Sequence, residues 1–277
     1  MKFIQVAITF AFASLLFGCT NLKEVQDFAG QSAQLSGYTE LTTRFRDTYY
    51  REQPYISGDA DRLAQENDLR RKAAYQDLLK IHQTISVYMQ TLATLAGDKS
   101  FDLTPGIDSV ASGIKAYPEF GIDKTQVDAL SGLAKIAAKW ATSSYQQRAV
   151  REFIKEGNEP LQTALIGMEK LIGYYQKTND NEWKTINGLL ELELSFTDQS
   201  EDKLLVTLAR AHLQAKASEY QLADKKYREA RKGIQTIAQG HGLLVENLDK
   251  LSRQEIKDSL RQFAKDIKAI NDHINSM

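Results

Sequence analysis

The chain has 277 residues, with 35 lysines and arginines against 36 aspartates and glutamates, and a single cysteine. This near balance, without a long basic run, excludes the concentrated positive face on which nucleic-acid binding depends. One cysteine excludes disulfides within the chain, thiolate metal sites and dithiol redox chemistry. The length is sufficient for a hydrophobic core that needs no disulfides.

The first eighteen residues have the pattern of a secretory signal. Met1 and Lys2 precede an apolar run, residues 4–18, which is too short to span a bilayer as a helix. The segment Leu16-Phe17-Gly18-Cys19 resembles the bacterial lipobox. The resemblance implies cleavage before Cys19, diacylglycerol on its sulfur and an N-acyl chain such as palmitate. Two alternatives remain open, namely a core helix with a buried Cys19 thiol, and ordinary signal cleavage that leaves a free cysteine.

We therefore expect residues 1–18 to be removed and residues 19–277 to form one domain anchored through Cys19. Loss of Lys2 leaves 34 basic against 36 acidic side chains, a balance of −2 that indicates no charged partner. In the lipoproteins that this signal resembles, an aspartate after the cysteine retains the protein in the inner membrane. Because Thr20 stands there, the resemblance implies the periplasmic face of the outer membrane.

The N-terminal part of the mature chain predicts two helical regions. Asn21 and Glu24 have capping-box spacing, and apolar residues recur at helical spacing from Leu22 to Tyr49, although Gly30 and Gly37 weaken the stripe. A second helix is predicted over residues 59–96. Residues 97–123 are the least regular part, in which Thr104-Pro105 predicts a short helix over 107–116.

A third helix is predicted over residues 124–155, with a surface rich in small residues that favours close packing. The segment 156–160, which contains Gly157 and Pro160, is expected to end it and to start the next helix. That helix carries an apolar stripe over 161–175, and helix is expected to resume or to continue over 182–194.

The C-terminal third predicts a helix over 198–238 that Gly240-His241-Gly242 interrupts. Ser252 and Glu255 form a second capping-box pattern before a helix with apolar spacings of four and three, as in a coiled coil. Taken together, the stripes predict an all-α fold, an elongated antiparallel bundle of five to six helices, several of them long.

Searches for catalytic and metal-binding patterns find none in the sequence. The four histidines lack the helical spacings of zinc or di-iron sites. His82 is expected to be a hydrogen-bonded core residue and His241 a turn residue, while Asp59 and Asp61 suit the positive end of a helix dipole. Nucleophile-elbow, phosphate-loop and calcium-loop motifs are also missing. We expect no catalytic, cofactor-binding or metal-binding residue, and no enzyme activity.

Two aromatic clusters could serve as contact patches or belong to the core, and the core is favoured because each has a residue on an apolar stripe. They are Tyr49, Tyr50 and Tyr55, and Tyr174, Tyr175 and Trp183.

The leading hypothesis for function is a lipid-anchored, non-enzymatic envelope lipoprotein that acts as a periplasmic protein-binding or scaffold module. Its partners would be the membrane, through the lipid, and a protein of unknown identity, without nucleic acid. One alternative is a membrane-active protein similar to α-helical pore-forming toxins, with the inserting hairpin in residues 101–141. Another is an immunity or exclusion lipoprotein.

Overall fold

The computed structural model describes residues 22–97, 106, 113–141, 147–198 and 201–276. Apart from one isolated bridge between Tyr117 and Ile122, the regular structure in these residues is helical, which confirms the predicted all-α class. The helices are α2 (Lys23–Ser32), α3 (Ser36–Arg46), α4 (Thr48–Glu52), η2 (Gln53–Tyr55), α5 (Gly58–Ala96), η3 (Pro118–Phe120), α7 (Lys124–Trp140), α8 (Gln147–Phe196), α9 (Lys203–Glu246) and α10 (Gln254–Ser276).

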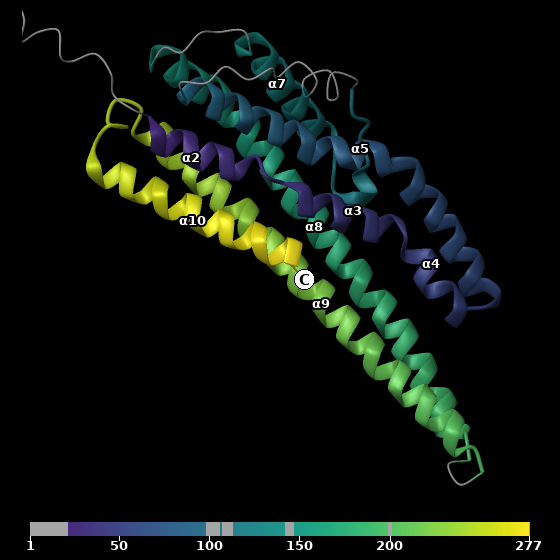
Figure 1. The fold of residues 1–277 in the computed structure, drawn as a ribbon. Helices are drawn as coiled ribbons and strands as arrows, with labels where there is room; N and C mark the ends of the chain where they lie inside the picture. The colour runs from purple at the N-terminus through teal and green to yellow at the C-terminus, as the bar shows by residue number, and fades with distance from the viewer. Residues whose placement is uncertain (1–21, 98–105, 107–112, 142–146, 199–200, 277) are drawn as a thin grey trace, which may run out of the picture.

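The long helices α8 and α9 form an antiparallel hairpin that determines the shape of the molecule (Figure 1). Helix α5 packs against the half of α8 farther from the hairpin end, and α10 runs back along α9. Helix α2 lies between α5 and α10, and α7 covers α5 and α8. At 1.5 Å per residue, α8 is about 75 Å long, so the hairpin extends beyond the helices that cover it.

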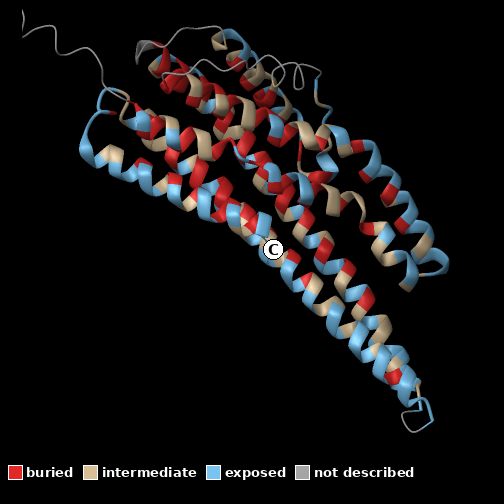
Figure 2. Cartoon of the chain, in the orientation of Figure 1, coloured by how far each residue is buried: buried red, intermediate tan, exposed pale blue. Residues whose placement is uncertain are grey.

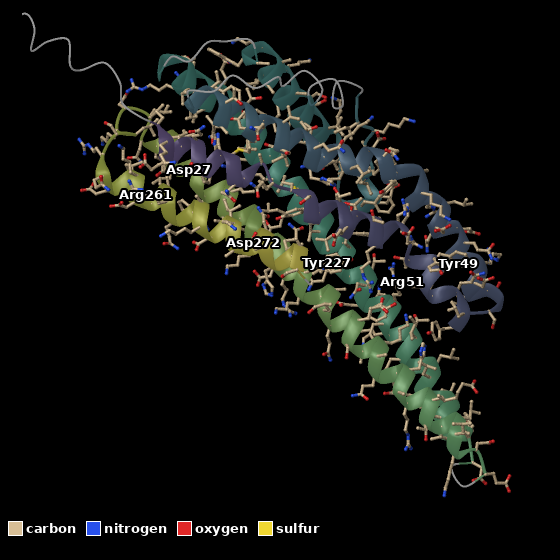
Figure 3. The ribbon with its side chains drawn as sticks, viewed as in Figure 1. Asp27, Tyr49, Arg51, Tyr227, Arg261 and Asp272 are labelled. Carbon is tan, nitrogen blue, oxygen red and sulfur yellow. The ribbon has the colours of Figure 1, made fainter. Side chains whose placement is uncertain are left out.

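The buried side chains gather where these helices overlap (Figure 2). Helix α5 contributes Tyr88 to this core, α8 contributes Phe153, and α9 contributes Ile234. The apolar stripe of α10, Leu260, Ile267, Ile270 and Ile274, is buried where α10 packs on α2 and α9. An ion pair of 2.7 Å between Arg261 Nη2 and Glu24 Oε1 also joins α10 to α2. Figure 3 labels Arg261 on α10 and Asp27 on α2.

The N-terminal stripe folds as three short helices, α2, α3 and α4, and the predicted helix start is close to the observed one. Helix α2 begins at Lys23, and Asn21 lies outside the described residues. A Cβ on Gly37, at the start of α3, would lie 2.5 Å from Ile274 Cγ2. The glycine therefore allows α3 to approach α10 closely. Next to it, the buried Tyr38 hydroxyl donates a 2.7 Å hydrogen bond to the Ala230 carbonyl of α9.

The predicted boundary at residues 156–160 is wrong, because α8 runs through it without a break. Helix α7 begins at Lys124 as predicted but ends at Trp140, so the predicted end of this helix at residue 155 is wrong. A Cβ on Gly157 would lie 2.1 Å from the Tyr88 hydroxyl, which shows that this glycine makes room for α5. Pro160 removes one backbone donor from α8 but packs against Gly132 of α7.

The predicted interruption at residues 240–242 is also wrong, because α9 continues to Glu246. A Cβ on Gly240 would lie 2.3 Å from the Phe28 ring, so the glycine permits contact with α2. His241 is fully buried in the helix and is not a turn residue. Its Nε2 lies 2.9 Å from the Tyr88 hydroxyl, and its Nδ1 lies 3.3 Å from Asn158 Oδ1.

The remaining helix predictions have mixed outcomes. The second helix is confirmed as α5. Of the short helix predicted over 107–116, residues 107–112 lie outside the described part and residues 113–116 are not helical. None of the described helices carries an apolar stretch long enough to cross a bilayer.

Candidate functional site

The far end of the α8–α9 hairpin, residues 187–211, stands apart from the rest of the fold, and we call it the arm. Just before the arm, the hydroxyl of Tyr55 in η2 lies 2.5 Å from Nε2 of His212. Among the arm residues that the structure describes, Val206 is the only buried one (Figure 2). The arm is therefore held mainly by the pairing of its own two helices.

Large apolar side chains are exposed at the end of the arm. Five of them lie within the last two turns of α8 and the first two turns of α9, and their exposed fractions run from 53% to 81%. Leucine and phenylalanine at such exposure leave apolar surface in water, which makes this end of the arm the candidate functional site. We call Leu192, Phe196, Leu204, Leu205 and Leu208 the tip patch.

The charges around the tip patch have one predominant sign. The arm carries five acidic residues against two basic ones, Lys203 and Arg210. The acidic residues are Glu191, Glu193, Asp198, Glu201 and Asp202. A surface that combines exposed aliphatic side chains with acidic neighbours is complementary to an apolar surface with a basic rim.

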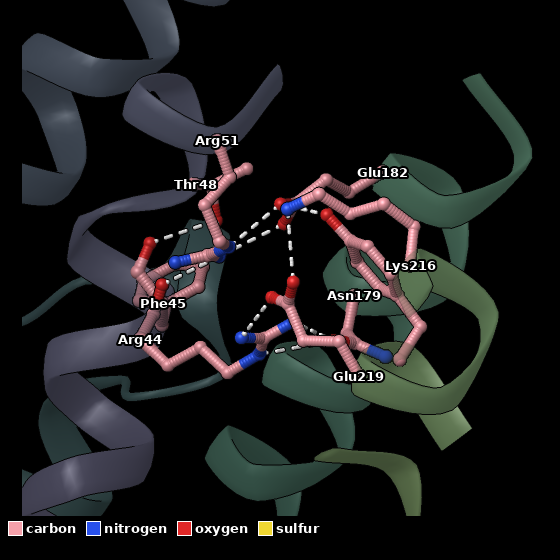
Figure 4. Close-up of polar contacts among 9 residues, drawn as sticks. Arg44, Phe45, Thr48, Arg51, Asn179, Glu182, Lys216 and Glu219 are labelled. Carbon is pink, nitrogen blue, oxygen red and sulfur yellow. Dashed lines mark hydrogen bonds and ion pairs between the residues drawn. The ribbon is translucent and has the colours of Figure 1, made fainter. Parts of the chain in front are cut away.

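At the base of the arm, a buried ion pair fixes α4 to the hairpin (Figure 4). Arg51 donates from Nε and Nη2 to the two carboxylate oxygens of Glu182, at 2.7 and 2.9 Å. Only 1% of the Glu182 side chain is exposed. The Tyr220 hydroxyl of α9 donates to the same carboxylate. Burial, together with the charge and hydrogen bond of Glu182, raises the pKa of Tyr220, which keeps this phenol protonated.

A second arginine at the base joins α3 to both helices of the hairpin. Arg44 donates from Nε and Nη2 to Asn179 Oδ1 of α8, each at 3.2 Å, and from Nη1 to Glu219 Oε1 of α9 at 2.9 Å. Lys216 lies 2.9 Å from the other Glu219 oxygen. Burial would raise the pKa of Glu219, but hydrogen bonds from Lys216 and Arg44 hold it below the usual range. The two arginines therefore fix the hairpin where the arm begins.

The aromatic clusters contribute to this base and to the core. Trp183 stacks on Tyr220 with ring centroids 5.4 Å apart, and Tyr175 is buried and stacks on Phe45. The first cluster is more open, since Tyr50 is exposed and Tyr49 donates a 2.9 Å hydrogen bond to Asp61 at the start of α5. The core interpretation thus holds for Tyr175, while Tyr50 is a surface residue.

Of the residues with a predicted role, Cys19 lies outside the described part of the chain. His82 is buried as expected, but its Nε2 has no hydrogen-bond partner in the described part, so the predicted hydrogen bond at this atom is not found. Among the described residues, no group of three or more histidine, cysteine, aspartate or glutamate side chains could hold a metal ion.

The arm and its base could not be located from sequence spacing. Arg51 and Glu182 are separated by 131 positions, and nothing local in the sequence pairs them. Leu204, Leu205 and Leu208 resemble an ordinary apolar stripe, and only the fold shows that no helix covers them. No protein-family model matches the chain, and no curated protein or solved structure matches it either.

Proposed function

We propose that this chain is a lipid-anchored envelope lipoprotein that binds a protein partner through the tip patch. The observation that carries the proposal is the group of five exposed apolar side chains at the end of a fixed, protruding arm. The signal-like segment before Cys19 supports the anchor, and Thr20 directly after it supports the periplasmic face of the outer membrane as the proposed location. No step of the proposal requires catalysis.

The position of the arm relative to the anchor supports binding at a distance from the membrane. Helix α2 begins four residues after Cys19, and Phe28 of α2 packs beside Gly240 of α9. From Gly240 back to Lys203, α9 is about 55 Å long at 1.5 Å per residue. The N-terminal end of α2 and the arm lie at opposite ends of the molecule (Figure 1). A lipid on Cys19 would therefore leave the tip patch facing away from the bilayer.

The acidic neighbours of the patch favour a protein over a lipid surface as its occupant. Anionic headgroups would repel the five acidic side chains of the arm. A protein that offers an apolar groove rimmed by lysine or arginine would satisfy both the exposed leucines and these carboxylates. The proposed partner is accordingly an envelope protein with a basic rim around an apolar surface.

Photocrosslinking in intact cells tests this proposal. A photoreactive phenylalanine analogue placed at Phe196 or Leu204 should give one reproducible adduct with a protein, because both side chains are exposed on the tip patch. Leu63 and Leu69 on α5 are similarly exposed and lie outside the arm, so they provide matched control positions. Adducts of equal yield from all four positions would contradict the proposal.

Two further measurements distinguish membrane attachment through the lipid on Cys19 from membrane binding by the arm. Cys19→Ser should release the protein from the membrane fraction, because the variant lacks the proposed lipid attachment site and none of the described helices is long and apolar enough to cross a membrane. Purified protein without the lipid should not sediment with vesicles of phosphatidylethanolamine and phosphatidylglycerol. Sedimentation that depends on Phe196 and Leu204 would show that the arm binds lipid, and would contradict a protein partner.

A further inference from the structure

A polar cavity of about 240 Å³ lies beside the base of the hairpin, between α4, α5, η3 and α8. Helix α8 presents Tyr174, Thr178, Asn181 and Thr185 to it, at spacings of four, three and four that place them on one face of the helix. The opposite wall is formed by α5, which contributes Arg71. Because the cavity is smaller than most drug-sized sites, its ligand would be small.

Arg71 is a buried guanidinium group with two nitrogens that lack hydrogen-bond partners, and its Cζ lies over the Phe45 ring, 5.9 Å from the centroid. Only 7% of the residue is exposed, and its Nε and Nη2 have no partner in the described part of the structure. Burial lowers the pKa of Arg71, while the nearby charges of Glu52 and Asp68 oppose this effect. A buried charge without hydrogen bonds is costly, and such groups are usually paired.

The two unpartnered atoms are those with which other arginines of this chain bind a carboxylate. Arg51 uses Nε and Nη2 to bind both oxygens of Glu182, and Arg46 uses them to bind both oxygens of Asp47 at 2.7 and 2.8 Å. This edge of the guanidinium group matches the spacing of two carboxylate oxygens. We propose that Arg71 binds a small carboxylate ligand in this cavity, after its side chain rotates so that Nε and Nη2 face the cavity.

The other charges at the cavity are compatible with an anion. Glu182 is held in an ion pair by Arg51, and Arg70 provides a second positive charge among the lining residues. Two more acidic residues, Glu52 and Glu119, also line the cavity. Burial and the charge of Glu182 raise the pKa of Glu52, while the charges of Arg71 and Arg51 oppose this effect.

The test follows the Nε–H resonance of Arg71 by NMR while acetate, glutarate or N-acetyl-Ala-Ala is added to the whole mature chain. The peptide distinguishes a free acid from the C-terminus of a protein. At least one probe should give a saturable shift, and Arg71→Lys should weaken its binding, measured by calorimetry, by about tenfold or more because the two-point contact is lost. Arg62→Gln, on the exposed face of the same helix, should leave binding unchanged.

Arg71→Met separates binding from a structural role. It should abolish binding while the melting temperature stays the same or rises, because the substitution removes a buried charge that has no hydrogen bonds at its Nε and Nη2. A saturable shift by inorganic phosphate alone would overturn the assignment to carboxylates. Failure of all three carboxylates to bind, or equal binding to Arg71→Met, would overturn the site itself.

Discussion

At the scale of single residues, the buried ion pair at the base of the arm should be sensitive to the loss of either partner. Glu182→Ala removes one partner of an ion pair in which the other, Arg51, is mostly buried. We expect a loss of about 3–5 kcal/mol in the free energy of unfolding, because the guanidinium group is left without its carboxylate. Urea denaturation of the purified protein measures this loss.

The matched control is the double variant Arg51→Met/Glu182→Leu, which replaces both charges by apolar groups of similar length. It should recover most of the lost stability, since neither side chain then remains charged and unpaired. If the single and double variants were equally unstable, the ion pair would not be the cause, and packing at this position would be.

Two buried histidines predict a loss of stability in acid. Burial lowers the pKa of His82 to about 4 and that of His241 to about 3, from an unfolded value near 6.5. Between about pH 6 and pH 4, the unfolded chain binds protons that the folded chain does not. The free energy of unfolding should therefore fall as the pH falls through this window.

The contribution of His82 can be isolated by comparing the wild type with His82→Gln at each pH, because the acidic groups common to both then cancel. The slope of unfolding free energy against pH between pH 6 and pH 4 should decrease by about 1 kcal/mol per pH unit in the variant. Identical slopes would mean that the imidazole of His82 is protonated in the folded state.

At the scale of helices, the structure shows why the class of the elements could be predicted and some of their boundaries could not. Apolar spacing identifies α5 and the C-terminal helix, since each buries one continuous stripe. Gly157, Pro160 and Gly240 resemble helix breaks in sequence. They lie inside helices because Tyr88, Gly132 and Phe28 of other helices pack against them, which is long-range information.

A pair of glycine substitutions in α8 tests this explanation. Alanine is about 1 kcal/mol more favourable than glycine in a helix, so Gly173→Ala, with open space around it, should stabilise the protein by up to about that amount. Gly157→Ala should instead destabilise it by about 1–3 kcal/mol, because the new methyl group meets the Tyr88 ring. Thermal unfolding of both variants measures these changes in stability. An increase in stability in both variants would contradict the explanation that packing against Tyr88 requires a glycine at position 157.

At the scale of the whole molecule, the same chain combines a well-packed body with an arm that buries little. The body has a core to which α5, α8, α9 and α10 all contribute, whereas Val206 is the only buried residue among the described positions of the arm. Arg44 and Arg51 fix the hairpin at the boundary between the two parts. This division lets the exposed tip patch remain in place without being part of the core.

The sequence suggested protein binding through the combination of a lipid signal and amphipathic helices, but it did not indicate where a partner would bind. Leucines of the tip patch and leucines of the core have the same spacing, and they differ only in what covers them. Likewise, the polar surroundings of Arg71 come from α4, α5, η3 and α8, which are brought together only by folding.

Recovery of the partner from crosslinked envelopes tests the central claim most directly. The experiment compares three proteins: the wild type, the arm variant Leu204→Ser/Leu205→Ser/Leu208→Ser and the control variant Leu63→Ser/Leu69→Ser. All of these leucines are more than half exposed, so each variant should fold and reach the membrane as the wild type does. We predict that the arm variant loses the partner and the control retains it. Equal recovery with all three proteins would contradict binding through the tip patch.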